Sequence, residues 1–162
     1  MCNVDEYFEK PFWVIDILPK QVPDYQQPES KKTHLAERGV KKGKGQYFTI
    51  EEYFLDHPRI DAIHGKFTNI LLKLNCYEDF DVSIDGEEWM KNPAPKVFEK
   101  MMSACMTDNG MIYIFMKSEE TLITVCGDDD TYMTIYHPSE EALKLLSALA
   151  LSEGLFIWQP VR

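Results

Sequence analysis

The chain has 162 residues, of which 17 are Lys or Arg and 27 are Asp or Glu, so its formal net charge at pH 7 is −10. This length favours a single domain over residues 1–162, and 44% hydrophobic and 12% aromatic residues are enough to build a buried core. The negative charge argues against nucleic acid or an anionic membrane as a partner, because binding to either depends on Lys and Arg side chains.

The apolar run Phe12–Leu18 is rich in aromatic and β-branched residues and stops at Pro19. This composition predicts a strand that is covered on both faces. The run is too short for a membrane span and contains Asp16, and no basic segment precedes it as in a signal peptide. We therefore expect a cytoplasmic protein.

Residues 20–46 differ from the rest of the chain in charge and composition. Prolines stand at the start of this segment and glycines at its end. Between 20 and 45 there are seven basic and three acidic residues, which leaves a net charge of −14 for the remaining chain. Because a loop of this length in a compact domain is usually functional or disordered, we predict a flexible basic loop over 20–46.

Two helices are predicted after this loop. Thr49 and Glu52 have the spacing of a capping box, so the first helix is expected to begin at Thr49 and to end before Pro58. The second helix follows Pro58, because apolar residues recur there with the period of one buried helical face. That face comprises Ile60, Ile63, Phe67, Ile70, Leu71 and Leu74.

The middle of the chain predicts one strand, one helix and three further strands. Residues 79–85 alternate between apolar and polar, as in a half-solvated strand. A helix is expected to start at Asn92-Pro93. Residues 111–117, 121–126 and 131–136 are predicted strands, and their short polar links favour antiparallel neighbours. The buried face of the helix is predicted to hold Val97, Phe98, Met101, Met102 and Cys105.

The C-terminal segment predicts a helix that starts within 137–140 and a last strand over 155–158, with Gly154 ending the helix. A strand, a helix and a strand in succession favour a parallel crossover. The expected fold is therefore α+β: a single mixed, mainly antiparallel sheet of about six strands, with helices packed on it and a C-terminal β-α-β crossover.

Four cysteines lie far apart in the sequence, without a C-x-x-C pair. Cys76, Cys105 and Cys126 stand within apolar patterns, whereas Cys2 is close to the N-terminus. This predicts reduced thiols, the last three of them buried, in a cytosolic protein, and neither a disulfide framework nor a zinc site.

Motifs for nucleophilic catalysis and phosphate binding are absent from the sequence. No G-x-S-x-G segment occurs. Gly39–Gly45 differs from a Walker A motif, because three residues separate its first two glycines and Gly45 replaces the Ser or Thr that binds Mg²⁺. We therefore predict no cofactor, and the sequence favours a protein that is not an enzyme.

One metal site is considered as an alternative. His57, Asp61 and His64 are spaced at i, i+4 and i+7, so one helical face offers two imidazoles and a carboxylate. Pro58 weakens this interpretation, because it places His57 at the helix start. The other interpretation is an ordinary solvated flank.

The acidic turn Asp128, Asp129 and Asp130 precedes a strand in which Tyr132 and Tyr136 alternate with apolar residues. If Met133 and Ile135 face the core, the two tyrosines lie on the opposite face of the sheet. Tyrosine is enriched in the energetic centres of protein interfaces, and the acids favour a basic partner. These five residues are the predicted partner-binding site, unless helices cover both faces.

Four segments resemble a family of small acidic bacterial proteins of uncharacterised function, and the chain is similar in size and acidity to immunity proteins of bacterial polymorphic toxin systems. The resemblance supplies no catalytic residues. The segments are Phe12–Pro19, Gln46–Phe54, Asp130–Tyr136 and Ser152–Trp158.

The function expected first is therefore a protein-binding module of the immunity type, which neutralises a basic toxin domain. The alternatives are a small metal-dependent hydrolase that uses the histidine–aspartate trio, and a homo-oligomeric scaffold protein.

Overall fold

The computed structural model describes residues 2–19, 45–127 and 131–160, which hold five helices and seven strands. In chain order these are α1 (Val4–Tyr7), β1 (Phe12–Asp16), α3 (Tyr47–Leu55), α4 (Arg59–Leu74), β2 (Asp81–Ser83), β3 (Met90–Lys91), α5 (Pro95–Thr107), β4 (Met111–Met116), β5 (Thr121–Cys126), β6 (Tyr132–Tyr136), α6 (Glu140–Ser152) and β7 (Phe156–Trp158).

The strands form one open sheet in the order β3-β2-β4-β5-β6-β1-β7, and every pair of neighbours is antiparallel. The predicted α+β class with helices packed on a single sheet is confirmed. The prediction of a mixed sheet needs correction, because all neighbouring strands are antiparallel. The strand missing from the prediction is β3, which has two residues and is too short to show a periodic pattern.

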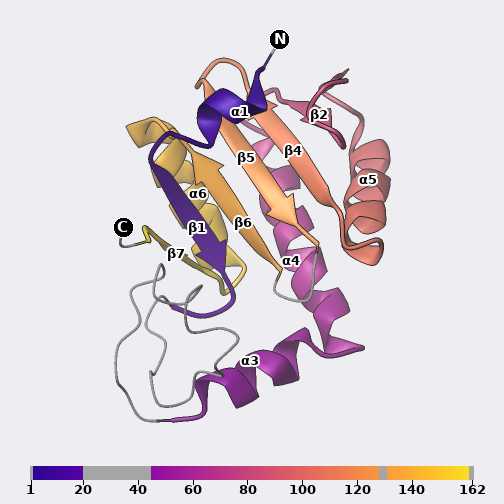
Figure 1. Cartoon of the computed structure of the whole chain (residues 1–162), viewed down its shortest axis with the longest axis vertical. Helices are drawn as coiled ribbons and strands as arrows, with labels where there is room; N and C mark the ends of the chain where they lie inside the picture. Colours follow the sequence, from indigo (N-terminus) through magenta and orange to yellow (C-terminus); the bar gives the residue numbers. More distant parts are fainter. Residues whose placement is uncertain (1, 20–44, 128–130, 161–162) are drawn as a thin grey trace.

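The predicted C-terminal crossover has an unexpected strand within it. Both β6 and β7 pair antiparallel with β1, so they run parallel to each other and α6 connects them. They are not neighbours, however, because β1 lies between them (Figure 1). The pairs Ile15–Met133 and Ile15–Ile157 show that the N-terminal strand completes the C-terminal part of the sheet.

One face of the sheet is covered by α4, α5 and α6: Figure 1 shows α4 and α6 behind the strands and α5 beside β4, and Phe98 and Met102 of α5 belong to the same core. The predicted apolar face of α4 is confirmed residue by residue, since all six of its members are buried. All of these side chains except Ile60 pack in one core cluster with Ile123, Met133 and Ile135, which are fully buried in the sheet. The core therefore lies between the sheet and these helices.

The start of α3 differs from the prediction. The helix begins at Tyr47 and its N-cap is Gln46, so Thr49 lies inside the helix and no capping box forms. The earlier start places Phe48 in the helix, where its ring is buried and lies 5.2 Å from that of Tyr47. Burial of an aromatic ring outweighs the free energy of a single capping hydrogen bond.

The start of α5 also lies later than predicted. Pro95 is at the first helical position, whereas Asn92 has a positive φ of 37° and donates its backbone N–H to the Phe80 carbonyl oxygen. Asn92 therefore belongs to the turn after β3. Along α5, Phe98, Met102 and Cys105 are buried as predicted, but Val97 is 41% exposed.

The two ends of α6 are fixed by side chains and by a glycine. Ser139 is the N-cap, and its hydroxyl accepts the Ala142 N–H at 3.0 Å. Gly154, which follows the helix, has a φ of +73°, as predicted for a residue that ends a helix in the left-handed region.

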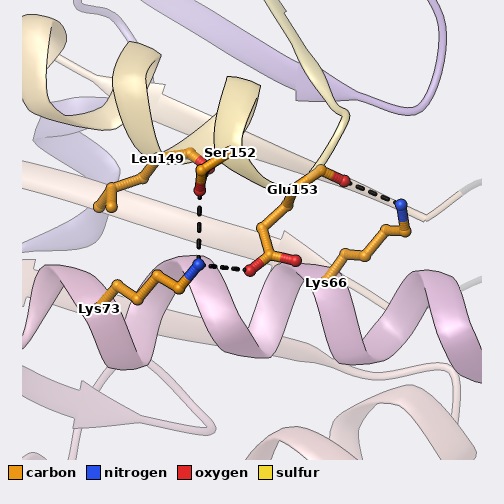
Figure 2. A network of polar contacts seen from close by, with 5 residues as sticks. All are labelled: Lys66, Lys73, Leu149, Ser152 and Glu153. Carbon is orange, nitrogen blue, oxygen red and sulfur yellow. Dashed lines mark hydrogen bonds and ion pairs between the residues drawn. The ribbon is translucent and has the colours of Figure 1, made fainter.

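Two lysines of α4 hold the C-terminal end of α6, as Figure 2 shows. Lys66 Nζ donates to the Glu153 carbonyl oxygen at 2.8 Å, and Lys73 Nζ lies 2.8 Å from Glu153 Oε1. Ammonium groups are favourable there, because the last carbonyls of a helix carry partial negative charge. These contacts fix α4 against α6.

Within the described residues, no helix combines the length and apolar character that crossing a membrane requires. The predicted basic loop over 20–46 lies outside these residues except for Gly45 and Gln46, which precede α3.

Candidate functional site

The second face of the sheet, opposite α4, α5 and α6, carries aromatic side chains. In β6, Met133 and Ile135 are fully buried in the core, so the prediction that the tyrosines lie on the opposite face is confirmed. The strand register brings further rings to this side. We call the half-buried side chains of Phe12, Tyr113, Phe115, Tyr132 and Tyr136 the aromatic face.

Strand pairing arranges these rings around a row of small residues. Tyr113 lies opposite Thr124, and Thr124 lies opposite Thr134 in the next strand. Both threonines are buried, at 4% and 5% exposure. Because side chains opposite each other in an antiparallel sheet lie about 5 Å apart, the large rings shield the short threonine side chains between them.

The rings at one end of the aromatic face contact the N-terminal segment. Tyr136 lies 5.3 Å from the Phe8 ring and 5.6 Å from the Phe12 ring, and Phe115 lies 5.7 Å from the Tyr7 ring. Figure 1 shows α1 crossing this end of the sheet. Tyr136 is therefore part of an aromatic cluster.

Of the five predicted partner-binding residues, the structure describes two. Tyr132 and Tyr136 are half-buried at opposite ends of β6, about 13 Å apart along a strand. Asp128, Asp129 and Asp130 lie outside the described residues, so their position relative to the tyrosines is not described.

A polar cleft lies between α4 and α5. Its volume is about 390 Å³. We call it the α4–α5 cleft; it is lined by Asp61, His64, Gly65, Thr68, Asn69 and Leu72 from α4, and by Glu99, Ser103, Met106 and Thr107 from α5.

His64 is held in this cleft by a contact with Thr131, the residue before β6. Its Nε2 lies 3.2 Å from the hydroxyl of Thr131, a fully buried residue. Burial lowers the pKa of His64, and His57 adds to this effect, whereas the nearby Asp61 carboxylate opposes it. The imidazole is therefore neutral at neutral pH.

The alternative metal site is not assembled. Asp61 and His64 line the α4–α5 cleft but His57 does not, and its backbone N–H donates to the Asp56 side chain. Across residues 2–19, 45–127 and 131–160, no three His, Cys, Asp or Glu side chains lie close enough to hold a metal ion. The proline before α4 separates His57 from the regular helical spacing.

The cysteines correct another prediction. Cys105 is buried, and burial raises the pKa of its thiol to about 11. Cys126 is half-buried, but Cys76 is exposed at the end of α4 instead of lying in the core. No disulfide joins any of the four cysteines, all of which are in the described residues.

The sequence did not predict several residues of the aromatic face and of the α4–α5 cleft. Tyr113 and Phe115 lie in a predicted strand, but only the register places them beside Tyr132 and Tyr136. Glu99 and Ser103 look like ordinary solvated positions of a helix, and it is the packing of α5 against α4 that places them opposite Asp61 and His64.

Comparison of the chain with protein-family models, with curated proteins and with solved structures finds no match. The assignment of function therefore rests on the surfaces described above.

Proposed function

We propose that this chain is a protein-binding module that contacts its partner through the aromatic face. The observation that carries the proposal is the gathering of five half-buried aromatic side chains on the side of the sheet away from α4, α5 and α6. Rings of this kind offer a large contact area at a small cost in conformational entropy, and Tyr is enriched where binding energy concentrates.

The charge of the chain supports a basic partner. With a net charge of −10 and a pI near 4.8, the protein attracts cationic surfaces and repels acidic ones. Complementary charge accelerates association and rejects wrong partners. The concrete form of the proposal is an immunity-type protein that covers a basic toxin domain in the bacterial cytoplasm.

The first step of the test is direct. The product of an adjacent gene is co-expressed with the chain, and association and dissociation rates of the purified pair are measured on a biosensor surface. Tyr132→Ala is expected to accelerate dissociation about 30-fold, which corresponds to about 2 kcal/mol for a ring at the centre of an interface.

A matched control is available in the same chain. Tyr77 is 70% exposed beyond the end of α4 and does not belong to the aromatic face, so Tyr77→Ala removes the same group elsewhere on the surface. This variant is expected to bind like the wild type.

The acidic residues are tested separately. Replacing Asp128, Asp129 and Asp130 with Asn is expected to slow association and to reduce the dependence of the association rate on salt.

Two outcomes would overturn the proposal. Equal dissociation rates for the Tyr132→Ala, Tyr77→Ala and wild-type proteins would show that the aromatic face is not the interface. Self-association of the purified chain in sedimentation experiments, lost on Tyr132→Ala, would instead make the aromatic face the interface of a homo-oligomeric scaffold.

A further inference from the structure

The α4–α5 cleft is built by one polar stripe from each helix. Asp61, His64 and Thr68 follow each other on one side of α4, and Glu99, Ser103 and Thr107 do so on α5. Spacings of three and four residues place side chains on the same helical face. The two stripes therefore face each other across the cleft, on the helix side of the protein.

Gly65 widens this cleft at some cost to α4. A glycine inside a helix is less stable than an alanine by about 0.5–1 kcal/mol. Close packing does not require Gly65, because a Cβ at this position would meet no atom within 4 Å. The glycine removes a side chain from the wall of the cleft, which leaves room for a ligand.

The charges that line the cleft have one sign. Asp61 and Glu99 are exposed carboxylates on opposite walls, and none of the described residues lining the cleft is Lys or Arg. The lysines of α4 nearest in sequence, Lys66 and Lys73, extend toward the end of α6 instead (Figure 2). With His64 neutral, the remaining polar groups are hydroxyls and an amide, which accept hydrogen bonds.

From this arrangement we infer that the α4–α5 cleft binds an organic cation, namely an alkylammonium or guanidinium group, free or at the end of a Lys or Arg side chain. Carboxylates on two walls accept N–H groups from such a cation through charge-assisted hydrogen bonds. Leu72 and Met106 offer apolar contact to its alkyl stem. A bare metal ion does not fit, because the described residues supply no group of three ligands there.

The test is a titration of the isotope-labelled protein with agmatine, which carries both cationic groups, followed by amide chemical shifts. Saturable shifts confined to residues 61–72 and 99–107 are expected. Asp61→Asn and Glu99→Gln are each expected to weaken binding about fivefold, as for charge-assisted hydrogen bonds at a partly exposed site.

Two control variants and one control compound make the result specific. Asp79→Asn and Glu87→Gln change the same charges at exposed positions that do not line the cleft, and both are expected to bind agmatine like the wild type. N-butylurea, a neutral compound of similar shape, is expected not to bind. Gly65→Leu fills the cleft without altering any charge and is expected to abolish the shifts.

A blocked arginine tripeptide distinguishes the two sources of the cation. Tighter binding of the tripeptide than of agmatine would assign the cleft to a basic side chain of a protein, and binding of agmatine alone would assign it to a free small cation. Shifts spread over the acidic surface, or equal weakening by the cleft and control variants, would overturn the inference. The cleft and the aromatic face are on opposite sides of the sheet, so this result is independent of the proposed function.

Discussion

Gly127 and Gly65 allow a single chemical change, Gly→Ala, to be tested in opposite directions. Gly127 follows β5, where its N–H donates to the Gly110 carbonyl oxygen at 2.8 Å. A Cβ at this position would contact the Cys105 carbonyl oxygen and lie 2.9 Å from the Met106 Cα. Ordinary contacts begin at 3.4 Å, and the Cys105 carbonyl oxygen is the nearest of these atoms, so the end of α5 must shift by about 1 Å.

The expected magnitudes follow from this geometry. Overpacking against backbone atoms costs about 1–3 kcal/mol, and the alanine recovers up to about 1 kcal/mol by restricting the unfolded chain. The clash is with backbone atoms, so the upper part of this range applies. Gly127→Ala should therefore lower the free energy of unfolding by about 1–3 kcal/mol, or lower Tm by about 2–12 °C in a protein of this size. Gly65→Ala, which meets no neighbour, should raise Tm by about 1–4 °C.

Thermal and urea unfolding, followed by circular dichroism and by Trp fluorescence, measure both effects. Coincident transitions by the two methods establish that unfolding is two-state, which the comparison requires. A Gly127→Ala protein as stable as the wild type would refute the packing argument at the junction of α5 and β5. A less stable Gly65→Ala protein would refute the statement that the wall of the cleft is open at this position.

Three further predictions concern single side chains. Ser139→Ala should destabilise the protein by about 1 kcal/mol in urea unfolding, because the Ala142 N–H loses its acceptor and the Glu119 carboxylate loses a donor, whereas Ser139→Thr, which keeps the hydroxyl, should retain stability. Burial lowers the pKa of His64 in the folded state, so the unfolded state binds a proton more readily and stability should fall as pH decreases through the pKa of the unfolded imidazole. His64→Gln should flatten this part of the stability profile, and an unchanged profile would contradict the assignment. In maleimide labelling followed by peptide mass mapping, exposed Cys76 should react in the native protein, whereas Cys105, with its thiol pKa raised to about 11, should react only after unfolding. Equal rates at the two thiols would contradict the burial of Cys105.

The parts of the fold that periodicity controls could be predicted from the sequence. The apolar face of α4 and the alternation of β6 were predicted correctly, because each depends on the burial of many side chains with one fixed spacing. Helix ends were predicted less well, because one capping group contributes little. Thr49 is not the first capping residue, as predicted, because α3 already includes the buried Phe48. Asn92 does not start α5, as predicted, because its backbone N–H donates to the Phe80 carbonyl oxygen in the turn after β3.

The aromatic face and the α4–α5 cleft could not be predicted from the sequence, because each is formed by residues that only the tertiary structure brings together. The sequence predicts which face of β6 Tyr132 occupies, but not that Tyr113 of β4 shares that face, because register depends on contacts between distant strands. Asp61 and His64 were noticed for their spacing on one helix. Glu99, which faces them from α5, has no local signal, since a charged residue on a helix surface is most often simply solvated.

The position of β1 between β6 and β7 has a consequence for synthesis on the ribosome. Strand β1 is made before all other strands of the described chain, yet both of its hydrogen-bonded neighbours are the two strands made last. Until residues 132–158 have emerged, the apolar side chains of β1 and both of its backbone edges have no native partner in the sheet. Unpaired strands of this kind are prone to pair with other chains. The nascent protein is therefore expected to rely on chaperone binding at its N-terminal segment, and stalling of synthesis before β6 should give an aggregation-prone product.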